Sequence, residues 1–205
     1  MKESSPSSRP LPRPFYARDT VRVARELLGK IVQHGPASGR IVEVEAYLGT
    51  GDLAAHSAHG VTLRTRVIFG PPGHAYVYLI YGVHACLNLT AEPEGSAGCV
   101  LIRALEPLTG IDLMRKRRGL REIEKLASGP GKLTEALGIT LRDNGADVTR
   151  EPILVVDDGS KAPDVAVSPR IGITKSADLP LRFFVRGSLF VSRRRPTEID
   201  TYYSR

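Results

Sequence analysis

The chain has 205 residues, of which 41% are hydrophobic and 25% are charged, the balance of an ordinary soluble globular protein with a buried core. Its formal net charge of +7 favours an anionic partner, most commonly nucleic acid, although a basic enzyme whose charge serves only solubility fits equally well. No apolar run reaches the roughly 20 residues that a membrane helix needs. The two cysteines, Cys86 and Cys99, lie in apolar runs, which predicts buried thiols and a reducing, cytosolic-type compartment rather than a disulfide framework.

The N-terminal segment predicts a tail followed by a folded domain. "MKESSPSSRPLPRP" lacks the apolar core of a signal peptide and is rich in Ser, Pro and Arg. We therefore expect residues 1–17 to form a disordered basic tail and residues 18–205 to form one domain. "RDTVRVARELLGK" predicts a helix that Asp19 caps and Gly29 ends. "KIVQHG" and "GRIVEVEAYL" predict two strands, and "GDLAAHSAHG" predicts a short helix or loop with two histidines.

The middle and the end of the chain predict more strands than helices. "AYVYLIYGVHACLNLT" is strongly strand-like, and Gly82 interrupts it, which predicts two strands or a bent hairpin with Tyr81 near the tip. "GCVLIRALEPL" predicts a further strand, and "TGIDLMRKRRGLREIEKLASG" predicts a highly charged helix. "SGPGKLTEALGI" predicts a turn that opens a helix, with Pro130 in its first turn. Because strands with local turns outnumber βαβ patterns, we expect an α+β fold with a mainly antiparallel sheet.

The strand "RIVEVEAYLG" carries two carboxylates and an aromatic ring in a row. Because strand side chains alternate with period two, its residues divide between two faces. One face takes Val42, Val44, Ala46 and Leu48, and the other takes Ile41, Glu43, Glu45 and Tyr47. Such carboxylates are typical of a divalent-metal site, of a general base with its neighbour, or of a solvated strand face, which is the commonest case. On the strand alone, the solvated face is the favoured interpretation.

Tyrosines are concentrated near this strand, and the chain has no tryptophan. In "AYVYLIYG", Tyr76, Tyr78 and Ile80 share one strand face, and Val77, Leu79 and Tyr81 share the other. Aromatic rings on a basic protein suit stacking on nucleic-acid bases. A flipped base needs a slot of this kind, with flat walls and hydrogen-bonding groups at its edge.

Four blocks together carry a family resemblance. "RIVEVEAYLGTGDLAAHS", "GHAYVYLIYGVHACLNLTA", "CVLIRALEPL" and "SGPGKL" resemble, in order, the alkyladenine (3-methyladenine, methylpurine) DNA glycosylase family of mammalian type, from about Thr20 to Ser192. The resemblance implies a single compact α+β domain with a curved, mainly antiparallel sheet, surrounding helices and a protruding β-hairpin. It also implies a monomer that needs no cofactor or metal, does not contact membranes, and excises damaged purines from double-stranded DNA in base excision repair. Such an enzyme works in the cytoplasm at the nucleoid of a bacterium, or in the nucleus of a eukaryote.

The resemblance also implies roles for individual residues. Glu45 activates the water that attacks C1′ while an oxocarbenium-like sugar departs, and His56 and Arg103 help to hold that water. The walls that stack on the extruded base are Tyr47, His56 and Tyr78. Asn88 crowds the exocyclic amine of guanine. Tyr81 wedges into the minor groove and fills the gap that the flipped nucleotide leaves.

Further residues are expected to contact the DNA backbone. The Gly-Pro-Gly turn before a helix presents free N–H groups to a phosphate, unless it is an ordinary proline-initiated helix. This turn supplies Ser128, Gly129, Gly131 and Lys132, and Arg64 and Arg66 are weaker candidates. His84 stands where mammalian relatives carry an aromatic residue, so we expect a phosphate or groove contact there instead of stacking.

Three rival interpretations stay open. The first is a metal-dependent nuclease built on Glu43 and Glu45, although no lysine stands in the usual place beside the pair. The second is a non-catalytic nucleic-acid-binding domain in which the tyrosines only stack. The third is a bifunctional glycosylase with a Schiff-base lysine at Lys132. Outside the nuclease hypothesis, Glu43 is expected to be structural or a surface charge.

Overall fold

A computed structural model describes residues 9–192 of the chain. Its helices are α1 (Arg13–Tyr16), α2 (Thr20–Leu27), α3 (Ile111–Arg118), α4 (Ile123–Leu126) and α5 (Pro130–Leu137), with the 3-10 turns η1 (His56–His59) and η2 (Leu141–Asp143). Its strands are β1 (Arg9–Pro10), β2 (Ile31–His34), β3 (Ala37–Tyr47), β4 (Ala75–Ile80), β5 (His84–Ala91), β6 (Gly98–Thr109), β7 (Thr149–Arg150), β8 (Ile153–Asp157), β9 (Val165–Ser168) and β10 (Arg182–Val185). No helix in this part of the chain is long and apolar enough to cross a membrane.

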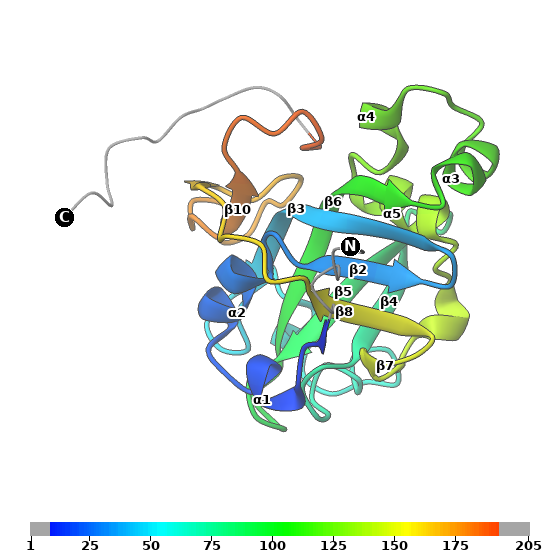
Figure 1. The fold of residues 1–205 in the computed structure, drawn as a ribbon. Coiled ribbons are helices and arrows are strands. Elements are labelled where there is room, and N and C mark those ends of the chain that lie inside the picture. The colour runs from blue at the N-terminus through cyan, green and yellow to red at the C-terminus, as the bar shows by residue number, and fades with distance from the viewer. Residues whose placement is uncertain (1–8, 193–205) are drawn as a thin grey trace.

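The strands form one curved antiparallel sheet in a single compact α+β domain, as the sequence predicts. Its main path runs β1-β8-β2-β3-β6-β5-β4, while β10 pairs with β3 and β9, and β7 pairs with β8. The two longest strands, β3 and β6, lie side by side at its centre (Figure 1). Helices α1 and α2 lie at one end of the molecule, and α3, α4 and α5 lie at the other (Figure 1).

One face of the sheet packs on the helices to form the main hydrophobic core. Residues from β3, β4, β5 and β6 alternate into it, and α2 and α5 cover it with leucines. Core members from these elements include Leu27, Val44, Val77, Leu87, Ile102 and Leu133. The alternate residues of the same four strands therefore face the other side of the sheet, where the candidate site lies.

The expected alternation along β3 is correct for Glu43, Glu45 and Tyr47 but wrong for Ile41 and Val42. Ile41 belongs to the main core, whereas Val42 is buried outside it. The pairing of β3 with β6 shifts between Ile41 and Glu43, so that β3 holds one extra residue there. A bulge of this kind reverses the faces of the residues on its two sides, and it re-aims the strand next to the site.

The N-terminal boundary that we expected at residue 17 is also wrong. Residues Arg9 and Pro10 pair with β8, and Leu11 and Tyr16 are buried in the main core. The fold therefore includes this segment from residue 9 onward, because Leu11 and Tyr16 bury their side chains in the core. The Pro- and Arg-rich composition around them had predicted a tail instead. The tail expected at residues 1–8 lies outside the described residues.

The predictions of the first helix and of the hairpin are confirmed, whereas the prediction of one charged helix is wrong. The Asp19 side chain accepts the Arg22 N–H at 2.9 Å, and Gly29 follows α2 with a φ of 85°. The charged segment forms two helices instead of one, because Gly119 takes a left-handed φ of 62° after α3. In the β4–β5 hairpin, Ile80 pairs with His84 and leaves Tyr81 in the turn. Only the Asn88–Ala91 part of β5 pairs with β6, so the hairpin extends beyond its neighbour.

Candidate active site

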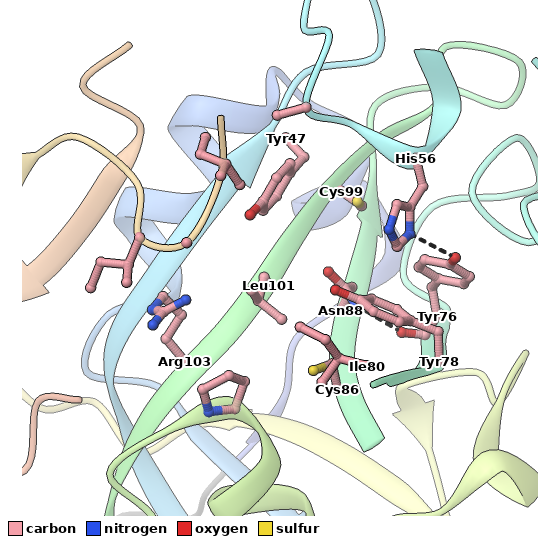
Figure 2. A pocket seen from close by; sticks show the side chains of 15 residues that line it. Tyr47, His56, Tyr76, Tyr78, Ile80, Cys86, Asn88, Cys99, Leu101 and Arg103 are labelled. Atoms are coloured by element: carbon pink, nitrogen blue, oxygen red, sulfur yellow. Dashed lines mark hydrogen bonds between the residues drawn. The ribbon is translucent and has the colours of Figure 1, made fainter. Parts of the chain in front are cut away.

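A cavity of about 210 Å³ lies on the sheet face opposite the main core (Figure 2). A cavity of this volume holds several water molecules and has room for a planar bicyclic base. Strands β3, β6, β5 and β4 supply its floor and walls, and Pro130 and the loop at residues 171–173 close it. The lining residues are Tyr47, Ala54, His56, Tyr76, Tyr78, Ile80, Cys86, Asn88, Cys99, Leu101, Arg103, Pro130, Ile171, Gly172 and Ile173.

The register of the sheet explains why distant sequence blocks meet here. Glu45 pairs with Leu101, Leu101 with Asn88, and Asn88 with Tyr76, which forms one row across four strands. Paired residues on neighbouring strands point to the same face, so these side chains converge. Three of the four blocks of the sequence that carry the family resemblance are therefore joined by β-pairing, and the fourth, "SGPGKL", reaches the cavity through Pro130 of α5.

Glu45 is fully buried beside the cavity, and both of its oxygens accept hydrogen bonds. Oε1 accepts the Ile171 N–H at 2.8 Å, and Oε2 accepts the Tyr47 hydroxyl at 3.0 Å. Arg103 Nη1 lies 3.3 Å from Oε2. Burial raises the pKa of Glu45, although Arg103 and the two hydrogen bonds oppose that rise. A carboxylate whose pKa is shifted toward neutrality is suited to general-base chemistry.

Glu43 is the ionised partner that holds Arg103 in place. Its Oε1 accepts Arg103 Nε at 3.0 Å and Arg182 Nε at 2.7 Å, and Oε2 accepts the Ser192 N–H at 2.6 Å. Burial raises the pKa of Glu43, but Arg103 and Arg182 outweigh this effect and hold the pKa below its usual value. Glu43 is therefore structural, and the alternative of a surface charge is wrong because the side chain is 0% exposed.

The charge between the two carboxylates argues against the nuclease hypothesis. The guanidinium of Arg103 contacts both Glu43 and Glu45, and thus occupies the space that a bridging cation would need. Within residues 9–192, no group of three or more His, Cys, Asp or Glu side chains could hold a metal ion. This paired arrangement suits a proton acceptor with a fixed counter-charge.

Aromatic side chains stand on two sides of the cavity (Figure 2). Tyr47 lies on one side, and the rings of His56 and Tyr78 meet edge to face at 4.6 Å on the other. His56 Nδ1 lies 3.0 Å from the Tyr76 hydroxyl oxygen, and its described contacts are with these tyrosines and not with Glu45. Burial, with Arg64 and His59, lowers the pKa of His56, so its ring is neutral at pH 7. The arrangement forms a slot with flat, uncharged walls.

The floor between these walls is compact and largely apolar. The Asn88 Nδ2 donates to the Tyr76 carbonyl at 3.1 Å, which fixes the amide on the floor. Both cysteines are free and buried, as expected, and burial raises the pKa of Cys99 to about 12. The thiols are therefore protonated at neutral pH and add polarizable surface to the cavity wall.

Two segments expected to contact DNA, the β4–β5 hairpin and the Gly-Pro-Gly turn, each contribute to the lining of the cavity. Tyr81 is 87% exposed at the tip of the hairpin with a left-handed φ of 53°, and Val83 beside it is 70% exposed. His84 packs against Gly131, where an added Cβ would lie only 2.9 Å from the His84 Cβ. The hairpin and the Gly-Pro-Gly turn thus adjoin, and the first turn of α5 has no side-chain cap.

The remaining expected contacts are dispersed around this site. The guanidinium of Arg64 lies 5.1 Å from the Tyr78 ring centroid, which places it at the cavity wall. Arg66 and Lys132 are exposed, Ser128 is half-buried, and Gly129 is buried at the start of α5. Lys132 is not among the residues that line the cavity, so nothing in its position favours a Schiff-base role.

Residues 14–189 match the family model of methylpurine-DNA glycosylase (MPG), which covers most of the chain. The chain belongs to the methylpurine-DNA glycosylase family. Many curated proteins provisionally named 3-methyladenine DNA glycosylase are also similar to it. One from Koribacter versatilis is 55% identical over 91% of this chain and 94% of its own length. Another from Methanoculleus marisnigri is 53% identical over 90% and 99%, and one from Rhodopseudomonas palustris is 54% identical over 91% and 89%. The resemblance inferred from four sequence blocks is thereby confirmed.

The structure adds residues to the site that the sequence motifs of this methylpurine-DNA glycosylase did not predict. Ile171 contributes a backbone N–H to Glu45, which no sequence pattern reveals because the donor is main chain. Arg182 and Ser192 complete the surroundings of Glu43. Arg170 stacks on Tyr47 with its guanidinium carbon 4.5 Å from the ring centroid. The segment "SPRIGIT" that carries Arg170 and Ile171 shows no motif, so its place at the site depends on tertiary packing.

Proposed function

We propose that this methylpurine-DNA glycosylase binds a damaged purine, flipped out of double-stranded DNA, in the cavity and hydrolyses its N-glycosidic bond there. Membership of the family makes the chain a DNA glycosylase, an N-glycosyl hydrolase that acts in base excision repair. The observation that carries the assignment of the site is Glu45, a buried carboxylate with a raised pKa next to an aromatic slot. The product is a free base and an abasic site.

In this proposal Glu45 acts as the general base. It accepts a proton from water while the water oxygen bonds to C1′, and the C1′–N bond breaks with its electron pair leaving on the purine. The Glu45 anion and the protein dipoles around it also stabilise the positive charge that develops on the sugar. Arg103 keeps the ionised form of Glu45 attainable in spite of burial. We assign Arg103 and His56 to the binding of the attacking water, because both line the cavity.

We assign the recognition of the base to the aromatic slot. Tyr47 on one side and His56 with Tyr78 on the other supply the stacking surfaces. Their uncharged rings suit alkylated purines that carry a positive charge, because a cation over an aromatic face is stabilised. Asn88 lies on the floor, where its fixed amide would crowd the exocyclic amine of guanine.

The contacts around the mouth of the cavity are assigned to the DNA itself. Tyr81 is the wedge that replaces the flipped nucleotide in the stack. The uncapped first turn of α5 suits a phosphate, because its first N–H groups have no partner within the helix and Lys132 adds charge. The phosphate contacts assigned here are His84, Arg64, Arg66, Ser128, Gly129, Gly131 and Lys132. These residues come from one chain, which supports action as a monomer. We place that action at the nucleoid in a bacterial cytoplasm or in a eukaryotic nucleus.

The test is incubation with duplex oligonucleotides that each hold one damaged purine, such as hypoxanthine, ethenoadenine or 7-methylguanine. Abasic sites are scored by alkaline cleavage, and release of the free base is the expected result. Activity in EDTA separates this function from that of a metal-dependent nuclease. Absence of borohydride trapping separates it from Schiff-base chemistry at Lys132. Binding without base release by the wild-type chain would leave only a nucleic-acid-binding domain.

A further inference from the structure

Arg170 lies behind the aromatic wall of the cavity and does not itself line the cavity. Its side chain is 0% exposed, and its guanidinium covers the Tyr47 ring at 4.5 Å from the centroid. The same group donates to the Ala46 carbonyl at 3.0 Å, directly before Tyr47 in β3. Arg170 therefore fixes both the ring of Tyr47 and the backbone that carries it.

Arg170 is also adjacent to both of the hydrogen bonds from Tyr47 and Ile171 to Glu45. The residue after it, Ile171, donates its N–H to Oε1 at 2.8 Å. The ring on which it stacks carries the Tyr47 hydroxyl that donates to Oε2 at 3.0 Å. A displacement of Arg170 would therefore move the donors to both oxygens of the base at once.

A buried ion pair with Asp52 extends this arrangement to the opposite wall. Arg170 Nη1 lies 2.5 Å from Asp52 Oδ2, and Nη2 lies 2.8 Å from Oδ1. The same carboxylate accepts the N–H groups of Leu48 and Ala54, each at 3.1 Å. These contacts fix the segment that connects Tyr47 with His56, and hence the spacing of the two sides of the slot.

The energetics favour a role in orientation over a role in stability alone. A buried ion pair contributes little net stability, because desolvation of the two charges offsets their attraction. Arg170 Nε is moreover buried without a hydrogen-bond partner among residues 9–192, which adds a cost. A planar, bidentate guanidinium does supply a defined direction and a flat stacking surface, which a lysine or an apolar side chain does not.

We infer that Arg170, held by Asp52, is a positioning residue of the glycosylase reaction, which aligns Glu45 through Ile171 and Tyr47 and sets the width of the base slot. This inference rests on the proposed function of the same site. Because Arg170 orients the reacting groups, its loss should lower the rate of the chemical step more than the affinity for DNA.

The test compares Arg170→Lys and Asp52→Asn with wild type in single-turnover base release, with enzyme in excess over a hypoxanthine duplex. We expect each substitution to lower the rate about 10- to 100-fold at pH 7, the cost of misplacing a reacting group by about 1 Å. The matched control is Arg40→Lys, which alters another β3 ion pair, at 2.8 Å to Asp158, away from the cavity and should leave the rate unchanged. Affinity for the duplex is measured in parallel and should change less than the rate.

The pH profile separates positioning from a general loss of folded protein. Glu45 is faced by Arg103 from β6, by Glu43 and Tyr47 from β3, by Arg182 opposite it on β10, and by the Ile171 N–H. Loss of the Tyr47 and Ile171 hydrogen bonds raises the pKa of Glu45 further, so the acidic limb of the rate profile should move to higher pH. The Arg170→Lys rate should then recover partly as the pH is raised. A loss that is equal at every pH and accompanied by a lower melting temperature would overturn the inference.

A double substitution tests the route through Tyr47. Arg170→Lys should cost less in a Tyr47→Leu background than in wild type, because the stacked ring and its hydroxyl are already gone. Equal losses in both backgrounds, or wild-type rates in Arg170→Lys and Asp52→Asn, would refute the positioning role. Absence of base release by wild type in the same assay would instead refute the proposed function.

Discussion

Replacing Arg103 with Met removes the counter-charge shared by two buried carboxylates. Glu43 keeps Arg182 and Ser192, but Glu45 keeps only the Ile171 N–H and the Tyr47 hydroxyl. At 3.3 Å and an effective dielectric constant of about 20, the lost attraction to Glu45 is about 5 kcal/mol. Removing one partner of a buried pair typically costs about 3–5 kcal/mol, so we expect Arg103→Met to lower the free energy of unfolding by about that amount at pH 7.

The pH dependence of this loss identifies its cause. Without Arg103, burial raises the pKa of Glu45 further, so the folded variant binds a proton that the unfolded chain releases. A folded pKa above the unfolded value gives stability that is present at low pH and lost as the pH rises toward the folded pKa. Arg103→Met should therefore be less destabilised near pH 5 than near pH 8. Base release at pH 7 should fall with it, because the protonated base is inactive.

Urea denaturation at several pH values and single-turnover base release measure the two effects. Adding Glu45→Gln should restore part of the lost stability, because a neutral amide needs no counter-charge. Arg182→Met is the matched comparison, since the side-chain ion pair of Arg182 is with Glu43, whereas Arg182 meets Glu45 through the pairing of β10 with β3. It should destabilise the fold with a smaller shift of the acidic rate limb. A pH-independent loss of stability in Arg103→Met, or no rescue by Glu45→Gln, would refute this account of the charge pair.

The remaining predictions concern Glu45, Asn88 on the cavity floor, and Tyr81 at the hairpin tip. Glu45→Gln should bind damaged duplex DNA yet release the base at least about 10²–10⁴-fold more slowly, and near-normal single-turnover rates would overturn its assignment. Asn88→Ala should raise excision of 7-methylguanine relative to hypoxanthine, and an unchanged ratio would count against exclusion of guanine by the amide. Tyr81→Ala should shift base flipping back by one to two decades, because base–aromatic stacking contributes about 1–3 kcal/mol, whereas Tyr81→Phe should retain it. A fluorescent base that brightens when unstacked reports the flipping equilibrium. Because Tyr81 is 87% exposed, the melting temperature of Tyr81→Ala should equal that of wild type. A lower melting temperature of this variant would show that the ring belongs to the core.

The site also explains why one strand carries two glutamates with different chemistry. Glu43 and Glu45 share a face of β3 and are equally buried, yet the pKa of the first is lowered and that of the second is raised. The difference lies in their partners, because two arginines face Glu43 whereas Glu45 shares one of them. When the environments of two neighbouring titratable groups separate their pKa values, the two groups can take different roles. Glu43 is then the structural carboxylate that holds Arg103, and Glu45 is the proposed base.

The sequence by itself determined the elements whose causes are local. Asp19, Gly29 and Pro130 mark helix ends at the positions where the structure has them, because caps and turns depend on neighbouring residues. Gly82 and the flanking alternation likewise predicted the hairpin and the exposed Tyr81. The family followed from motifs that stand in the chain as written, and with it the strand that carries Glu45.

Only the tertiary structure decided what surrounds these residues. Period two placed Glu43 and Glu45 on one face, but it did not reveal whether water or protein covers that face, since Arg182 and Ser192 arrive from 139 and 149 residues away. The same reason conceals Arg170, which is 124 residues from the Ala46 carbonyl that it binds. The bulge at Val42 and the packing of Leu11 and Tyr16 depend on partner strands and core shape in the same way. Burial, and with it the pKa of a carboxylate, is a property of the assembled fold and not of the strand.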